Sequence, residues 1–181
     1  MGILPVLLAL SLLVSAVALL NARREYRTDG KLSTWGLILV CLMLFVPNLL
    51  LEYATRYSWP DTAVEYAGAI LAILGLALCL AGIVHFRSTR KVFCMEPGSL
   101  TLTGPYRWGR NPQYLGWLLF ITGFAVMYWS PWCLAALLVV AVSLHLLVLI
   151  EEEHLRRVFG QPYIEFCRRV PRYFGPRRSD A

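Results

Sequence analysis

Two short polar stretches of the sequence hold most of the residues that could carry out chemistry. Residues 104–116, GPYRWGRNPQYLG, combine arginines, aromatic rings and an Asn-Pro pair. Residues 151–166, EEEHLRRVFGQPYIEF, open with three glutamates. Each stretch adjoins the long apolar hairpin that separates them. We therefore expect the two stretches to build one site at the mouth of a group of membrane helices.

The first stretch is suited to binding an anion. A helix that begins at Pro112 presents free backbone N–H groups and the positive end of its dipole beside Arg107 and Arg110. A carboxylate or a phosphate would be stabilised there. The structural alternative is a plain helix start, in which the Asn111 side chain caps the helix and the arginines contact lipid phosphates.

The second stretch is suited to binding a cation. Glu151, Glu152 and Glu153 follow an apolar run at the carboxyl end of a helix, where negative charge is unfavourable for the helix dipole. A ligand that carries an ammonium and a sulfonium would compensate this charge. The structural alternative is a set of i to i+4 ion pairs, which can join Glu152 to Arg156 and Glu153 to Arg157. These pairs leave Glu151 without a cation.

His145 and the flanking aromatic residues are further candidates. His145 is ionisable, lies inside an apolar run and shares a helical face with Glu152, seven residues later. It either lines the site or bonds to a neighbouring helix. The aromatic rings either anchor helices at the membrane interface or stack on a planar ring or a cation. They are Tyr106, Trp108, Tyr114, Trp117, Phe159, Tyr163, Phe166 and Tyr173.

The composition indicates that lipid surrounds much of the chain. Of its 181 residues, 58% are hydrophobic and 15% are charged, whereas a soluble domain carries about 25% charged residues. The mean hydropathy is +0.59. The net charge of +6 comes from short basic segments between apolar runs, which argues against a nucleic-acid-binding surface. Five scattered cysteines without metal-ligand spacing argue against a disulfide framework and a zinc site.

Five apolar runs predict an all-α integral membrane protein with five transmembrane helices in a single domain, residues 1–181. The predicted spans cover about residues 3–20, 32–54, 62–84, 112–129 and 131–150. A cleaved signal peptide is the alternative for the first run, but its positive charges follow the run instead of preceding it. Residues 85–111 are predicted to form an ordered loop with the first polar stretch, and residues 151–181 a carboxyl-terminal segment.

Local signals add detail to these spans. Pro47 and Asn48 lie inside the second span, where they either kink the helix or are tolerated by its neighbours. Thr62 and Glu65 have the spacing of a capping box, and Ser130 is predicted to cap the fifth span. Small residues recur along the third span, which predicts the close approach of another helix. They are Gly68, Ala72, Gly75, Cys79 and Gly82.

The positions of the basic residues predict the orientation. Sixteen of the 17 lysines and arginines lie in the first connection, in residues 85–111 or in the tail, and Arg56 in the second connection is the other one. By the positive-inside rule those three segments face the cytoplasm and the amino terminus lies outside. Both polar stretches are thus predicted on the cytoplasmic side.

With these stretches the chain resembles the isoprenylcysteine carboxyl methyltransferase family and its phospholipid methyltransferase relatives. The resemblance covers about residues 98–176, in the order GPYRxxRNPxYxG, uncharged hairpin, EExxLxxxFGxxYxxF and VPRYFGP. It implies a small multi-span α-helical enzyme that uses S-adenosylmethionine. It also implies a cytoplasmic cofactor site, which we expect the last two helices, the long third loop and the carboxyl-terminal tail to form.

The resemblance, read together with the chemistry of the residues, suggests individual roles. Arg107, Arg110 and His145 are the catalytic candidates, which would position the acceptor or handle a proton. Asn111 stands where many members of the family have His, so a role that requires imidazole is not implied. Phe166 replaces a frequent Tyr. The expected cofactor-binding residues are Tyr106, Arg110, Asn111, Pro112, Tyr114, Gly116, Glu151, Glu152 and Tyr163.

The expected function is methyl transfer from S-adenosylmethionine to a lipophilic acceptor that enters from the membrane. The acceptor could be a prenylated cysteine carboxylate, a phospholipid amine, or a small thiol or acid. An NADPH-dependent membrane reductase and a non-catalytic membrane scaffold are the alternatives from other classes. Neither the GxGxG loop of soluble methyltransferases nor a Rossmann GxGxxG is present, so a cofactor would need a helical, membrane-embedded cradle.

Overall fold

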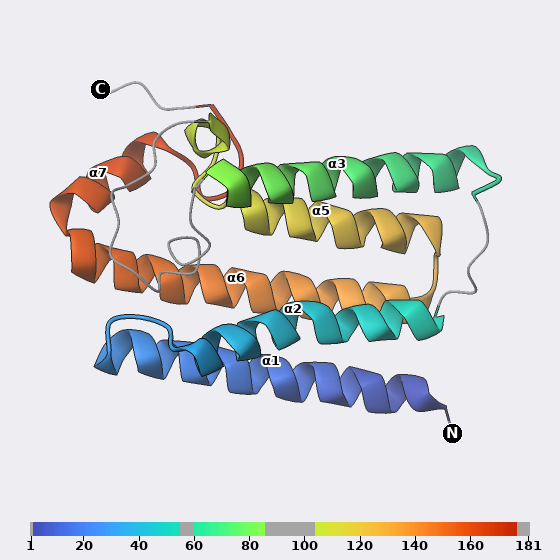
Figure 1. Ribbon diagram of the computed structural model, residues 1–181. Helices are drawn as coiled ribbons and strands as arrows, with labels where there is room; N and C mark the ends of the chain where they lie inside the picture. Colours follow the sequence, from blue (N-terminus) through green and yellow to red (C-terminus); the bar gives the residue numbers. More distant parts are fainter. Residues whose placement is uncertain (1, 55–59, 86–103, 177–181) are drawn as a thin grey trace.

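A computed structural model describes residues 2–54, 60–85 and 104–176, and all the regular structure in these ranges is helical. The five helices of 16 residues or more lie side by side in an elongated bundle, with the shorter elements gathered at one end (Figure 1). The elements are α1 (Ile3–Thr28), α2 (Thr34–Ala54), α3 (Ala63–His85), the 3-10 helix η1 (Gly104–Arg107), α5 (Pro112–Met127), α6 (Pro131–Phe159) and α7 (Gln161–Arg169).

Four of the described helices, α1, α2, α3 and α6, are long and apolar enough to cross a membrane. The fourth predicted span corresponds to α5, which is apolar but has only 16 residues. At about 1.5 Å per residue α5 is about 24 Å long, shorter than a hydrocarbon core of about 30 Å, whereas α6 is about 43 Å long. The turns of α6 from Glu151 onward therefore extend beyond its apolar part.

Two helices continue past the spans predicted for them. The first predicted span ends at residue 20, but α1 continues to Thr28. The fifth ends at residue 150, but α6 continues to Phe159. The two extensions contact each other, because the rings of Tyr26 and His154 stack with centroids 4.6 Å apart and both side chains are buried. A span predicted from hydropathy ends at the first charged residues. The helix itself continues beyond them where one of its faces still packs against a neighbouring helix.

The small residues of α3 lie against α5, as their spacing predicted. All five are buried, and a Cβ on Gly75 would collide with the α5 backbone at Phe120 and Gly116. Conversely, a Cβ on Gly116 would collide with the backbone of α3 at Cys79. We call this α3–α5 contact the glycine seam. Since backbones this close leave no room for larger side chains, the seam fixes the position of α5 and of the polar stretch that precedes it.

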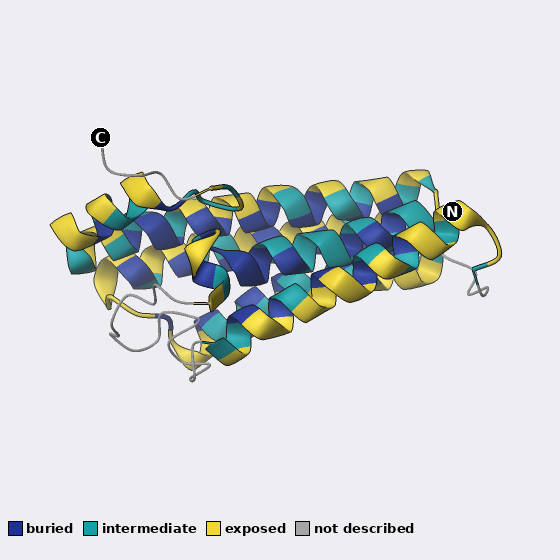
Figure 2. Cartoon of the chain, turned by 90° about the horizontal axis from the view of Figure 1, so that it is seen from above, coloured by how far each residue is buried: buried dark blue, intermediate teal, exposed yellow. Residues whose placement is uncertain are grey.

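The remaining helices, α1, α2 and α6, pack together on the other side of α5. Met43 and Leu50 of α2 and Leu147 of α6 are among the fully buried residues of this core. Phe45 of α2 contacts Trp117 of α5 edge to face, with centroids 5.1 Å apart. Figure 2 shows that buried positions follow the inward faces of the helices and exposed positions the outward faces. Many of the exposed side chains are large and apolar, as expected of helices that face lipid.

The capping signals predicted at Thr62 with Glu65 and at Ser130 are confirmed. The Thr62 N–H donates to Glu65 Oε2 at 3.0 Å, and the Glu65 N–H donates to Thr62 Oγ1 at 3.3 Å. Ser130 Oγ accepts from the Cys133 N–H at 3.3 Å. Helix α2 runs through Pro47 without interruption.

The predicted cap at Asn111 is wrong. Its side chain makes no capping hydrogen bond, although Pro112 is the first residue of α5. Instead, Asn111 Nδ2 donates to the backbone carbonyl of Arg172 at 3.1 Å. The carboxyl-terminal tail passes close to the start of α5 and takes the amide that would otherwise cap the helix.

The described parts of the three basic segments meet at one end of the bundle. Figure 1 shows the α1–α2 connection, the start of α5 and the tail at that end, and the amino terminus and the α5–α6 connection at the other. This agrees with the prediction that the polar stretches share one side. Which side of a membrane that is stays a prediction. Most of the predicted loop, residues 86–103, lies outside the described residues.

Candidate functional site

The end of the bundle at which the basic segments meet is called the polar end. A buried glutamate surrounded by arginines lies at its centre. Glu152 Oε1 accepts from Arg110 Nη2 at 2.8 Å and from Arg172 Nε at 3.0 Å, while Oε2 accepts from Arg172 Nη2 at 2.9 Å. The side chains of Glu152 and Arg110 are only 3% and 8% exposed. The predicted pair with Arg156 is present at 3.5 Å and is the longest of these contacts. Burial of these charges is tolerated because they neutralise and hydrogen-bond one another.

Arg110 also joins the first polar stretch to the tail. Its Nη1 donates to the carbonyls of Cys167 and Val170, at 2.9 and 2.8 Å, at the carboxyl end of α7. A guanidinium is favourable there because the end of a helix carries partial negative charge. Its backbone N–H donates to Pro171 O at 3.0 Å. Its buried Nε has no hydrogen-bond partner among the described residues. The cluster formed by Arg110, Glu152 and Arg172 therefore keeps one unused donor.

The other two glutamates point in different directions. Glu151 is 5% exposed, and its Oε1 accepts from the hydroxyl of Tyr114 on α5 at 2.7 Å. Glu153 turns to the surface, where it pairs with Arg27 of α1 at 3.2 Å and with Arg157 at 3.5 Å. The local pair predicted for Glu153 is thus confirmed. Glu151 has a hydroxyl where a cation would be needed to balance its charge.

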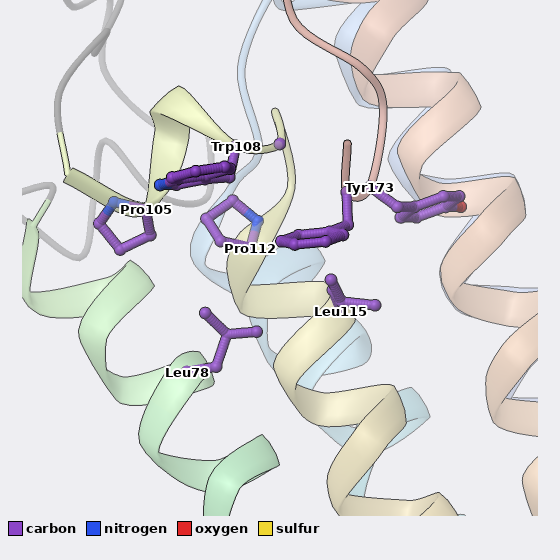
Figure 3. A pocket seen from close by; sticks show the side chains of 8 residues that line it. Leu78, Pro105, Trp108, Pro112, Leu115 and Tyr173 are labelled. Atoms are coloured by element: carbon purple, nitrogen blue, oxygen red, sulfur yellow. The ribbon is translucent and has the colours of Figure 1, made fainter. Parts of the chain in front are cut away.

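His145 reaches the same tail one residue beyond Arg172. Its Nδ1 lies 2.8 Å from the hydroxyl of Tyr173, and the tautomer decides which group donates. Figure 3 shows the Tyr173 ring pointing toward α6. Since Arg172 contacts Glu152 and Tyr173 contacts His145, the tail follows the face of α6 that His145 and Glu152 were predicted to share.

An apolar pocket of about 220 Å³ opens beside this cluster (Figure 3). Two aromatic rings stand over it, Trp108 and Phe174, with centroids 6.2 Å apart and planes 16° apart. It is smaller than a typical pocket of about 300–1,000 Å³, so it can admit one part of a ligand. The lining residues are Leu78, Pro105, Trp108, Gly109, Pro112, Leu115, Tyr173 and Phe174.

The pKa values of Arg172 and Tyr163, near the cluster, are shifted in the direction that stabilises the ordinary charge state of each group. The hydrogen bonds to Glu152 raise the pKa of Arg172, so this guanidinium stays charged. Burial raises the pKa of Tyr163 on α7, so its phenol stays neutral at physiological pH. The cluster thus combines fixed cations with a neutral aromatic wall.

The structure brings most of the predicted site residues together. Arg110, Asn111, Tyr114, Glu151, Glu152 and Tyr163 lie in or beside the cluster. Tyr106 instead braces η1, because its hydroxyl lies 3.0 Å from Gln113 Oε1 and 3.3 Å from Gly82 O. Gly116 belongs to the glycine seam, and Arg107 is exposed at the end of η1.

Sequence reasoning predicted that the tail helps to form the site but missed two of the residues that it contributes. Arg172 and Phe174 were not predicted as site residues, although one supplies two hydrogen bonds to Glu152 and the other lines the pocket. Both lie in the VPRYFGP block, which had contributed to the family resemblance without receiving a role. That block was the signal that could have identified them.

Comparison with known proteins identifies the family of the chain. The phospholipid methyltransferase family model matches residues 64–162, more than half of the sequence. The chain belongs to this family. The match includes the glycine seam, the first polar stretch and the three glutamates, and it ends just before Tyr163. No solved structure matches the chain.

Curated relatives of this family member carry one activity in their names. The present chain is 27% identical over 165 residues to protein-S-isoprenylcysteine O-methyltransferase from Homo sapiens, a match that covers 84% of this chain and 52% of the relative. The Arabidopsis thaliana enzyme, form B, is 27% identical over 139 residues, which cover 74% of this chain and 69% of the relative. A probable enzyme from Oryza sativa subsp. indica is 31% identical over 113 residues, 59% of each chain. The chain thus spans about half the length of the human relative.

Proposed function

We propose that this protein is an S-adenosylmethionine-dependent integral membrane methyltransferase that acts on a lipophilic acceptor. The observation that carries the proposal is the buried cluster of Arg110, Glu152 and Arg172 beside an apolar pocket, built from segments that the methyltransferase family model includes or adjoins. We place this site on the cytoplasmic side, because the basic connections and the tail gather at its end of the bundle.

The residues present fit the proposed cofactor. S-Adenosylmethionine supplies an electrophilic methyl group on a sulfonium, and it carries a carboxylate, an ammonium and an adenine. The unused Nε–H of Arg110 suits the carboxylate. The buried carboxylates of Glu151 and Glu152 suit the ammonium or the ribose hydroxyls. Trp108 and Phe174 offer flat faces to a planar ring.

The chain contributes mainly orientation and exclusion of water. Tyr114 holds the carboxylate of Glu151 in place, and Arg172 holds that of Glu152 with two hydrogen bonds. Positioned groups of this kind lower a barrier without taking part in bond making, which suffices where the methyl group is already activated. The apolar outer faces of the helices give a lipophilic acceptor a path from the membrane.

The acceptor decides whether a proton must move. A carboxylate acceptor can attack without a base, and this is the acceptor that the names of the relatives favour. An amine or thiol acceptor would need a base. His145 could take that proton at Nε2 when its Nδ1–H donates to the Tyr173 oxygen.

The test is a methyl-transfer assay on the purified protein with methyl-labelled S-adenosylmethionine. The acceptors offered separately are a prenylated cysteine with a free carboxylate, phosphatidylethanolamine and a lipophilic thiol. Labelled product from the prenylated cysteine, lost in Glu152→Gln and retained in Glu165→Gln on the exposed face of α7, is the expected result. NADPH-dependent reduction of a membrane lipid without transfer to any of the three acceptors would contradict the proposal.

A further inference from the structure

We propose that residues 170–175, called the strap, position the site and complete its pocket, and that Gly109, Asn111 and Arg172 are the positioning residues that hold the strap. The consequence for ligand binding rests on the proposed function, whereas the docking of the strap does not. None of the three residues needs to touch a reacting atom for this role.

Backbone and side-chain amides join the strap to the stretch before α5. The Arg110 N–H donates to Pro171 O at 3.0 Å, and the Gly175 N–H donates to Trp108 O at 3.1 Å. Between these two bonds, Asn111 Nδ2 donates to the carbonyl of Arg172 at 3.1 Å. Three bonds along six residues hold the strap in one register across the start of α5.

Gly109 is required by this register. A Cβ at position 109 would collide with the backbone carbonyl of Tyr173, so any other residue must push the strap away. Gly109 has no positive φ, which means that its conformation alone does not demand glycine. The close approach of the strap is the reason for the residue.

The strap side chains join α5 to α6 and build the pocket. Arg172 holds Glu152 of α6 with two hydrogen bonds, and Tyr173 contacts His145 of the same helix. Tyr173 and Phe174 are two of the eight residues that line the pocket. Without the strap, Glu152 would lose Arg172, one of the two arginines closest to its carboxylate. The pocket would lose the wall that Tyr173 and Phe174 form.

This geometry gives Asn111 a role that differs from capping. The amide N–H donates to the strap, and the side-chain oxygen accepts no hydrogen bond from the first turn of α5. An imidazole also offers an N–H donor, so histidine can replace asparagine here. Aspartate has the same shape but turns a carboxylate oxygen toward the Arg172 carbonyl, where no hydrogen bond can form.

The test is hydrogen exchange of the full-length protein in detergent, read by mass spectrometry on peptides that cover residues 170–176. Asn111→Asp and Arg172→Gln should raise exchange there about tenfold, because each removes contacts that keep the strap closed. Asn111→His should stay within about threefold of the original rate, as a rescue by the conservative donor. Arg168→Gln, an exposed arginine near the end of α7, is the matched control and should change nothing.

Unchanged exchange of α1 and α2 in each variant shows that the protein is folded. Asn111→Asp keeps the side-chain volume, so it tests the strap without the clash that a larger residue at position 109 would introduce. Exchange at residues 170–176 that does not rise in Asn111→Asp or in Arg172→Gln would overturn the proposal.

A titration with S-adenosylhomocysteine separates the strap from the function that it serves. Positioning predicts that Asn111→Asp weakens binding about tenfold and that Asn111→His restores it. Faster exchange with unchanged affinity would overturn the positioning role. If the unmodified protein binds no S-adenosylhomocysteine, the proposed function fails, while the exchange rates still decide whether the strap is held as described.

Discussion

The glycine seam and the polar end hold neighbouring parts of α5 by opposite means. In the seam, Gly75 and Gly116 let two backbones touch, and dispersion forces and lipid exclusion supply the contact. At the polar end, the first turn of α5 and Arg110, two residues before it, are held by charged hydrogen bonds to α6 and the tail. Apart from three serines, the buried polar residues among those described lie at that end: Asn111, Gln113, Glu151, Glu152 and His154. We therefore expect the seam to contribute mainly to stability and the polar end mainly to the proposed ligand binding.

The largest expected effect comes from filling the seam. Gly75→Val places two methyl groups where the α5 backbone lies, so the helices must separate. We expect a loss of about 3 kcal/mol or more, which would leave little folded protein. Size-exclusion chromatography and thermal unfolding in detergent would measure it. Ala77→Val, on the exposed face of α3, is the control and should behave like the original chain; equal stability of both variants would contradict the seam.

The second effect comes from the centre of the cluster. Glu152→Gln removes the charge that balances Arg110 and Arg172, and leaves a buried guanidinium without its carboxylate. Buried partners left unpaired in this way cost about 3–5 kcal/mol at most, and less where the tail can relax. We expect thermal unfolding to shift downward by less than in Gly75→Val, with S-adenosylhomocysteine binding abolished. Full binding by this variant would break the comparison.

A smaller effect is expected at the contact between α5 and α6. Tyr114→Phe keeps the ring and removes the hydroxyl that donates to Glu151. Loss of this hydrogen bond should cost about 1–3 kcal/mol, because both groups are buried. Titration should show S-adenosylhomocysteine affinity reduced several-fold with the helical circular dichroism unchanged. Tyr53→Phe, exposed on α2, serves as the control; the same loss in both variants would remove the special role of Tyr114.

The smallest effect is expected at the surface pair between α1 and α6. Arg27 and Glu153 lie 3.2 Å apart, but their side chains are 49% and 46% exposed. Solvent screens such pairs, so Arg27→Gln should change the unfolding free energy by less than about 1 kcal/mol and leave ligand binding as it was. Thermal unfolding at low and high salt would measure this change. A loss of binding would extend the site to α1, contrary to the comparison.

Much of the bundle could be predicted from the sequence because its determinants are local. Apolar runs predicted the helices, the spacing of Gly68 to Gly82 predicted a close neighbour, and Thr62 with Glu65 predicted a cap. The positions of the basic residues predicted that the polar stretches share one end. Each of these signals lies within a few turns of the structure that it specifies.

The site could be predicted only in part because its closing contacts are distant in sequence. The bond from Asn111 to Arg172 joins residues 61 positions apart, and that from Arg110 to Glu152 joins residues 42 apart. Charge and spacing identified Arg110, Glu151 and Glu152, but no local pattern shows which segment will lie across the start of α5. The cap assigned to Asn111 was wrong for this reason, and the role of Arg172 was missed.

The measurement that tests the central claim most directly is calorimetric titration of the detergent-solubilised protein with S-adenosylhomocysteine and, separately, with NADPH. We expect saturable binding of S-adenosylhomocysteine alone, lost in the double variant Glu151→Gln, Glu152→Gln and retained in Arg27→Gln. Binding of NADPH alone, or S-adenosylhomocysteine binding that survives in the double variant, would contradict a methyl-donor site at the polar end.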